Sequence, residues 1–195
     1  MNRVIFLVDG FNLYHSLDSA QRDSGGKTTK WLDLRSLCVS FLPIAGRLFG
    51  ERAVLEAIHY FSAPPTHMGS GKQQRHRLYM ECLRSSGIAV ELGRFKWKNK
   101  TCPFCGAHIS MYEEKETDVA IATRLFEVCQ TDQAETIILV TGDTDLAPAV
   151  RLCRKMFPEK LIFFAFPYRR ANSELKAIAP GSFSIKRRSY LRHQF

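Results

Sequence analysis

The sequence predicts an α/β protein with a doubly wound, mostly parallel sheet, helices on both faces and a small cysteine-bearing loop insertion. Two observations predict this organisation, one for the fold class and one for the number of domains. Apolar runs of strand length alternate with amphipathic stretches of helix length along the 195 residues, which is the pattern of parallel strands joined by crossover helices. No linker rich in proline, glycine or like charges divides this alternation. We therefore expect a single domain over residues 1–195.

The strands are expected where short apolar runs end at turn residues. Val4–Val8 is an unbroken apolar run that stops at Asp9, which is typical of a parallel strand buried on both faces. Thr136–Val140 has the same character and stops before a glycine. The other expected strands are Ala57–Ser62, Ile88–Phe95 and Leu161–Phe166.

The helices are expected in the amphipathic stretches between the strands. Within Glu116–Thr131, a helical spacing puts Asp118, Ala122 and Leu125 on one face, which we expect to pack on the sheet. The other expected helices are Leu32–Leu48, Lys72–Ser85, Leu146–Met156 and Ser173–Ile178. Loops are expected at Asp18–Lys30, at Ala63–Lys72 and at the insertion Lys96–Tyr112.

The composition is that of a globular protein with a polyanionic partner. Hydrophobic residues make up 45% of the chain and charged residues 24%, which excludes wholesale disorder. The net charge of +9 favours a phosphate-bearing partner such as a nucleic acid over a neutral one.

Location is predicted from the first apolar run and the cysteines. The first run stops at Asp9, so it is too short for a signal peptide, and no membrane-spanning segment is visible. Four cysteines stand singly among apolar residues, as buried thiols of a reducing compartment do: Cys38, Cys82, Cys129 and Cys153. We expect a cytoplasmic protein without a membrane partner.

Acidic residues follow two of the expected strands. The first strand ends in Asp9-Gly10-Phe11-Asn12, and the strand Thr136–Val140 is followed by Thr141-Gly142-Asp143-Thr144-Asp145. Parallel strands place their carboxyl ends at one edge of the sheet, where ligands bind. Asp118, in the first turn of the helix expected over Glu116–Thr131, is a third source of negative charge.

Two interpretations compete for these acids. Taken one by one, each is better explained as a turn residue or helix cap, with Asp145 a candidate cap for the helix at Leu146. Taken together, several carboxylates at one edge would repel each other without a cation. Carboxylate oxygens suit Mg²⁺ or Mn²⁺ better than zinc, and such a site on a basic protein indicates nuclease chemistry.

These motifs resemble the NYN domain family, a branch of the PIN-like ribonucleases. The resemblance lies in Asp9-Gly10-Phe11-Asn12, Lys115-Glu116-Thr117-Asp118-Val119 and Thr141-Gly142-Asp143-Thr144-Asp145, which occur in the family's order, and it extends from Val4 to about Ile185. It implies a PIN-like fold and Mg²⁺- or Mn²⁺-dependent endonucleolytic cleavage of RNA.

The resemblance also implies roles for individual residues. It implies that Asn12 orients the substrate or the acids, that Lys115 faces a phosphate, and that Ser173 opens the last helix beside the RNA. Glu116 departs from the family, where a small or neutral residue is commoner; it either adds a fifth acid or faces solvent. The metal-binding acids implied by motif position are Asp9, Asp118, Asp143 and Asp145.

Cys102-Pro103-Phe104-Cys105-Gly106 has the spacing of a zinc knuckle within the insertion 96–112. A structural zinc site, a redox pair and an unliganded pair are the interpretations that remain open. A complete zinc site needs two more ligands, either from a second chain or from the histidines His108, His67, His76 and His59.

Basic residues also gather with aromatic residues, as in surfaces that hold phosphates and stack unpaired bases. The alternative for each cluster is a solvated basic face. The clusters are Arg94–Lys100 with Lys96, Trp97 and Lys98, then Tyr168 with Arg169 and Arg170, and the start of a basic tail at 186–195.

The function predicted from these features is a metal-dependent endoribonuclease that acts on RNA, expected to be single-stranded. Two other interpretations remain: an RNA-binding regulatory module with a degenerate nuclease site, and a small-molecule phosphatase. A second copy of the chain or an inhibitory protein are further partners that the sequence leaves open.

Overall fold

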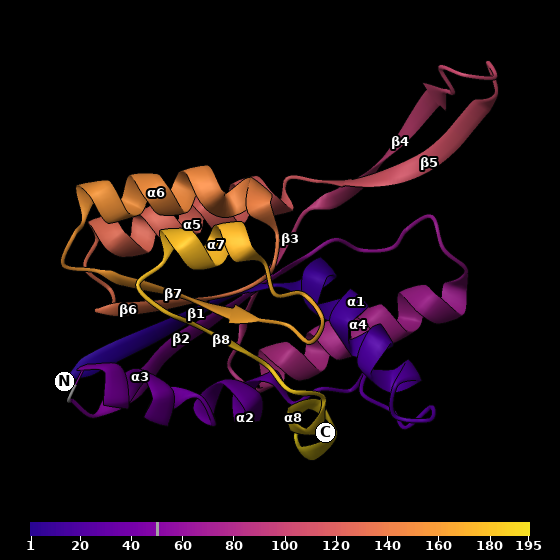
Figure 1. The fold of residues 1–195 in the computed structure, drawn as a ribbon. Helices are drawn as coiled ribbons and strands as arrows, with labels where there is room; N and C mark the ends of the chain where they lie inside the picture. Colours follow the sequence, from indigo (N-terminus) through magenta and orange to yellow (C-terminus); the bar gives the residue numbers. More distant parts are fainter. Residues whose placement is uncertain (50) are drawn as a thin grey trace.

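A computed structural model describes residues 1–49 and 51–195. A parallel sheet of six strands in the order β3-β2-β1-β6-β7-β8 lies between two layers of helices (Figure 1). This arrangement confirms the α/β fold class. The strands of the sheet are β1 Asn2–Asp9, β2 Ala53–Ser62, β3 Ala89–Leu92, β6 Thr136–Val140, β7 Leu161–Phe166 and β8 Ser182–Ser184.

The helices divide between the two faces of the sheet. One layer holds α5, α6 and α7, and the opposite layer holds α1, α2, α3, α4 and α8 (Figure 1). Their bounds are α1 Gly10–Arg22, α2 Leu34–Val39, α3 Leu42–Phe49, α4 Ser70–Ser85, α5 Thr117–Gln130, α6 Ala147–Met156, α7 Ser173–Ile178 and α8 Arg187–Arg192, with a 3₁₀ turn η1 at Thr144–Leu146.

Strand β1 shows why both layers form. Its side chains alternate between the faces of the sheet, so Val4, Phe6 and Val8 join one apolar core while Ile5 and Leu7 join the other. All of them are buried. No helix in the described part of the chain is long and apolar enough to cross a membrane.

The first loop prediction was wrong at its start, because α1 continues to Arg22. Asp9 begins this helix by accepting the backbone N–H of Asn12. Leu13, Leu17 and Ala20 then bury one narrow face of an otherwise polar helix. The polar residues that suggested a loop therefore occupy its solvent side.

The predicted helix Leu32–Leu48 is two helices, α2 and α3, separated after Val39. Pro43 accounts for the break, because a proline is accepted in the first turn of a helix but cannot continue one. The basic tail at 186–195 contains α8, whose Tyr190 is fully buried and shares a hydrogen bond with the Ser16 hydroxyl.

The insertion predicted as a loop is a β-hairpin of β4 Arg94–Thr101 and β5 His108–Lys115, which projects from the body (Figure 1). The strand predicted over Ile88–Phe95 is present but shorter, because β3 ends at Leu92 and β4 begins at Arg94. A side chain at Gly93 would lie 2.6 Å from the carbonyl of Lys115, so the chain passes close to β5 there before the hairpin begins.

Candidate metal centre

Three aspartates meet at the carboxyl edge of the sheet. Asp9 ends β1, Asp143 follows β6, and Asp118 lies in the first turn of α5. Because β1 and β6 are neighbours in the sheet, their ends lie side by side. One carboxylate oxygen from each aspartate lies within 4.8 Å of the others, and this is the one such group found among the described residues.

Asp9 is the buried member of the group, with 5% of its surface exposed. One of its oxygens accepts the N–H of Asn12 at 2.9 Å, and the other accepts the hydroxyl of Thr141 at 2.8 Å. Burial raises the pKa of Asp9 to about 6, although these hydrogen bonds lower it; the charges of Asp118 and Asp143 add to the rise. The helix-cap role and the charge cluster therefore coexist in this residue.

Asp143 is held by the same threonine. Its backbone N–H donates to the Thr141 hydroxyl oxygen at 3.0 Å, and its carboxylate accepts the N–H of Asp145 at 3.0 Å. Asp143, and not Asp145, therefore begins the turn before α6. Asp145 is exposed and lies outside the group of three, but its charge contributes to the environment of Asp118.

Asp118 occupies the exposed rim, although the sequence suggested the face packed on the sheet. Partial burial raises its pKa, and the charges of Asp143 and Asp145 raise it further. Glu116 contacts Arg94 in an ion pair at 2.6 Å, so it is a partner of the hairpin and does not join the acids.

Glu114 is a neighbouring acid that the sequence interpretation missed. It is half-buried on β5, and its Oε1 accepts the hydroxyl of Thr117 at 2.6 Å. Burial raises its pKa to about 7, and the charges of Asp9 and Asp118 add to the rise. The signal available in the sequence was a period of two over Tyr112–Glu114, which puts both side chains on one face of a strand.

Asn12 links the two strand-end motifs. Its backbone N–H donates to Asp9, and its side-chain oxygen accepts the N–H of Gly142 at 3.2 Å. A side chain at Gly142 would collide with the carbonyl of Arg170, so the loop after β7 packs tightly against this motif. Asn12 therefore orients backbone and carboxylate at the same edge.

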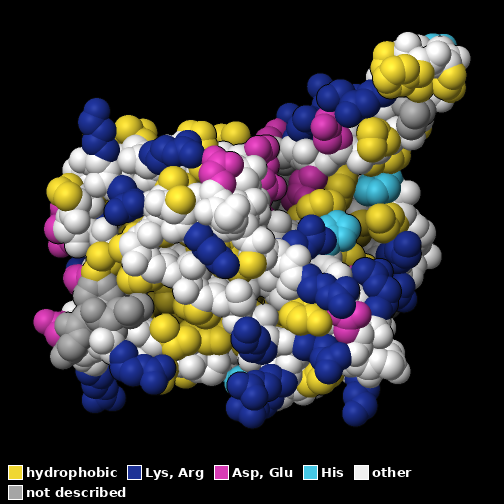
Figure 2. All heavy atoms as spheres, in the orientation of Figure 1, with side chains coloured by type: hydrophobic (Ala, Val, Ile, Leu, Met, Phe, Trp, Pro, Cys, Tyr) yellow, Lys and Arg dark blue, Asp and Glu magenta, His cyan; other side chains and the backbone are white. Residues whose placement is uncertain are grey.

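These acids border a hollow of about 300 Å³ at the base of the hairpin. Phe11 enters it from α1, and Phe95 and Tyr112 from the hairpin. Figure 2 shows acidic side chains gathered near the base of the hairpin and Lys and Arg side chains over the body below. The remaining lining residues are Asp9, Asn12, Glu113, Glu114, Lys115, Glu116, Thr117, Asp118 and Asp143.

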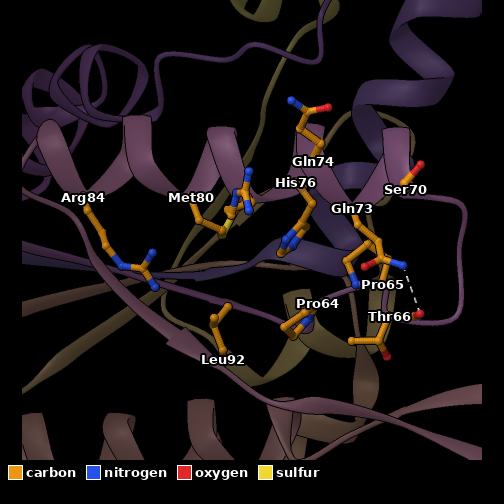
Figure 3. A pocket seen from close by; sticks show the side chains of 11 residues that line it. Pro64, Pro65, Thr66, Ser70, Gln73, Gln74, His76, Met80, Arg84 and Leu92 are labelled. Atoms are coloured by element: carbon orange, nitrogen blue, oxygen red, sulfur yellow. Dashed lines mark hydrogen bonds between the residues drawn. The ribbon is translucent and has the colours of Figure 1, made fainter.

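A larger hollow of about 500 Å³ lies between α4 and the loop that follows β2. Figure 3 shows His76, Met80 and Arg84 of α4 pointing toward Pro64 and Leu92. The His76 ring bonds to the hydroxyl of Ser62 at 3.2 Å. Among the described residues that line this space there is no carboxylate, so the acidic hollow is the better candidate for phosphate chemistry.

The residues predicted to bind RNA are dispersed. Lys115 lines the acidic hollow, where it forms an ion pair with Glu113. Burial lowers the pKa of His15, and the charge of Arg170 lowers it further. Arg170 therefore lies near His15, which follows the first acidic motif. Arg169 pairs with Asp23 instead. Lys96, Trp97 and Lys98 lie along the hairpin, and Ser173 opens α7, all outside the hollow.

Cys102 and Cys105 lie at the tip of the hairpin. The backbone N–H groups of Cys105 and Phe104 donate to the Cys102 sulfur, and with the Cys105 side chain they lower the pKa of its thiol. Within the described residues no third ligand joins them to form a metal group; the nearby His108 ring contacts the Thr101 hydroxyl. A zinc site at the hairpin tip therefore stays a prediction.

The fold and the acidic edge define a class of α/β proteins that carry carboxylates at the ends of parallel strands. A family model described as the NYN domain matches residues 3–186, and the chain belongs to this family. A search of curated proteins found no match.

A solved structure supports the fold. It is the crystal structure of a protein of unknown function, VPA0982 from Vibrio parahaemolyticus RIMD 2210633. The two share 18% sequence identity with a TM-score of 0.61, over 95% of this chain and 93% of that one. At this identity the likeness concerns the fold alone.

Proposed function

We propose that this protein is a metal-dependent endoribonuclease, in which Asp9, Asp118 and Asp143 hold Mg²⁺ or Mn²⁺. The observation that carries the proposal is the convergence of their carboxylates within 4.8 Å. Membership of the NYN family and the net charge of +9 support RNA as the substrate.

The residues fit a hard divalent cation. All three donors are carboxylate oxygens, which such cations prefer, and the raised pKa values of Asp9 and Asp118 show that their charges are poorly compensated within the protein. A bound cation supplies Lewis-acid catalysis and neutralises charge on a phosphodiester.

Neighbouring residues fix the positions of these acids. Thr141 and the Asn12 backbone fix both oxygens of Asp9, so its carboxylate has one orientation. Glu114 borders the same hollow, and burial raises its pKa to about 7 in the metal-free protein, so it is a further acid beside the three aspartates. The hollow lies on the surface, so an RNA strand can cross it without threading an end, as internal cleavage requires (Figure 2).

The test is cleavage of a labelled RNA with Mn²⁺, Mg²⁺ or EDTA, comparing wild type with Asp143→Asn. We expect metal-dependent cleavage that is largely lost in Asp143→Asn, because one carboxylate ligand is removed. The matched control is Asp132→Asn, which removes an exposed carboxylate before β6, at the opposite edge of the sheet. Cleavage unchanged in Asp143→Asn would refute the site.

The alternative is an RNA-binding regulatory module with an inactive site. It predicts salt-sensitive RNA binding in the same assay without metal-dependent cleavage. The intact group of three carboxylates favours the enzyme. Cytoplasmic location, a zinc-bound hairpin tip and an inhibitory partner or second copy stay predictions.

A further inference from the structure

The hairpin has two chemically different faces. Residues paired across an antiparallel ladder point to the same side, so the pairs Phe95–Glu114 and Trp97–Tyr112 define one face. The intervening pairs define the other, which carries Lys96, Lys98 and Lys100 on β4. One face is therefore aromatic and the other is basic.

The aromatic face begins inside the acidic hollow. Phe95, Tyr112 and Glu114 all line that space, and Phe11 borders it from α1. Trp97 continues the face outward, with its ring centroid 4.9 Å from that of Tyr112. A row of rings therefore leads from the three aspartates along the hairpin.

These rings are held in place but are not buried. His67 stacks on Tyr112 with centroids 4.3 Å apart and planes 12° apart, and it meets Phe95 edge-on at 4.6 Å. Trp97 nevertheless exposes 51% of its surface and Tyr112 exposes 41%. Exposed aromatic area costs free energy in water, so a fixed and exposed row beside a reactive site indicates a ligand surface.

We propose that this surface, here called the ring row (Phe11, Phe95, Trp97 and Tyr112), binds unpaired bases of the RNA next to the phosphate that is cleaved. The proposal rests on the proposed nuclease function and adds the surface of this chain that would hold the bases of its RNA substrate. Aromatic side chains stack on any base through its exposed π-face. Bases inside a duplex already have both faces covered, so a duplex cannot use the ring row.

Charge favours a nucleic acid over an apolar peptide as the occupant. The reverse face bears Lys96, Lys98 and Lys100, and its acid Glu113 is already paired with Lys98 and Lys115. The ribbon thus combines rings with excess positive charge, which is the combination that single-strand binding surfaces use. The hollow of about 300 Å³ lies at the small end of the range for ligand pockets, which is about 300–1,000 Å³.

The first experiment measures binding separately from cleavage. The Asp143→Asn protein is titrated into a single-stranded RNA that carries one 2-aminopurine, whose fluorescence is quenched when it stacks. We expect quenching, and a roughly tenfold weaker Kd when Tyr112→Ala or Trp97→Ala is added. Tyr112→Phe keeps the ring and should bind as the parent does.

The matched control is Phe104→Ala, which removes a ring that is 97% exposed at the hairpin tip, away from the ring row. It should leave both Kd and quenching unchanged. If Tyr112→Ala and Trp97→Ala bind as tightly as Phe104→Ala does, or if the RNA does not bind, the ring row is not a base site.

The second experiment compares wild-type cleavage of one labelled strand, alone and annealed to its complement. We expect the single strand to be cut at least tenfold faster; equal cutting of the duplex would overturn the proposal. The outcomes separate the two hypotheses. Cleavage without ring dependence removes the ring row but keeps the nuclease, whereas ring-dependent quenching without any cleavage keeps the ring row and removes the nuclease.

Discussion

At the scale of residues, Thr141 connects the two aspartates that end neighbouring strands. Its hydroxyl donates to Asp9 and accepts from the backbone of Asp143, and it is buried. A side chain with one donor and one acceptor site is needed there, which serine also provides and valine does not. The sequence interpretation named the carboxylates but not this hydroxyl, because a lone threonine before a glycine carries no signal without the sheet.

Thr141→Val should therefore destabilise the metal-free protein by about 1–3 kcal/mol, since it leaves a buried carboxylate oxygen and an N–H without a partner. Thr141→Ser keeps the hydroxyl and should lose less than half as much. Denaturant unfolding in EDTA measures both values. Equal stability of the two variants would show that these hydrogen bonds do not hold the strand ends.

Glu114 links stability to pH. Its pKa is about 7 in the folded protein and 4.5 as an unperturbed group, so the folded state binds more protons between these values. Its contribution therefore favours folding below about pH 4.5 and is lost as pH rises through about 7. The negative charge that forms costs free energy because the carboxyl group is half-buried beside Asp9 and Asp118.

In EDTA, the difference in unfolding free energy between Glu114→Gln and wild type should therefore shift in favour of the variant by about 2 kcal/mol as the pH rises from 5 to 8. Glutamine can still accept the Thr117 hydroxyl, so the local hydrogen bond survives. The control is Glu113→Gln on the opposite face of the hairpin. Hydrogen bonds from Lys115 and Lys98 lower the pKa of Glu113 to about 2, so its effect should not change over this range. Thermal unfolding at several pH values measures the difference, and parallel curves for wild type and Glu114→Gln would contradict it.

At the scale of elements, predictions succeeded where burial dominates and failed where amphipathic patterns are weak. The bounds of β6, β7 and α7 were predicted residue for residue, and the apolar run of β1 was found. Helix α1 was missed because tertiary packing of Leu13, Leu17 and Ala20 stabilises a largely polar segment.

The hairpin was missed for a different reason. Its alternation separates aromatic from basic residues, not buried from exposed ones, so Arg94–Lys100 was interpreted as a cluster of basic and aromatic residues and not as a strand. The alternating pattern was present in the sequence, but a projecting ribbon has no core to show which face is inner. Its position beside the aspartates follows from the close approach of Gly93 to Lys115, which a sequence does not reveal.

At the scale of the whole molecule, topology explains why the acidic motifs could be assigned from the sequence. Ligands of an open parallel sheet collect at the carboxyl ends of its strands, and β1 and β6 are central neighbours in the order observed. Asp9 and Asp143 were therefore brought together by fold class alone. Asp145 was not, because the turn that begins at Asp143 leaves the next carboxylate exposed.

The net charge of +9 also acts across the whole molecule, and its contribution to RNA binding can be separated from that of the rings. Each cation that contacts a phosphate of single-stranded RNA steepens the dependence of log Kobs on log salt by about 0.7. Stacked rings release no counterions, so they change affinity without changing this slope.

The variant replaces Lys96, Lys98 and Lys100 together by glutamine in the Asp143→Asn protein. Titration with single-stranded RNA between 50 and 200 mM salt should then give a slope of log Kobs against log salt that is shallower by up to about 2. Tyr112→Ala should weaken binding at every salt concentration along a line parallel to that of the parent. The matched control replaces Arg151, Arg154 and Lys155 of α6 by glutamine, which removes the same charge from a helix in the opposite layer from α1 and α4. If this control flattens the slope as much as the hairpin variant does, the protein attracts RNA through its overall charge, and the hairpin lysines hold no phosphate of their own.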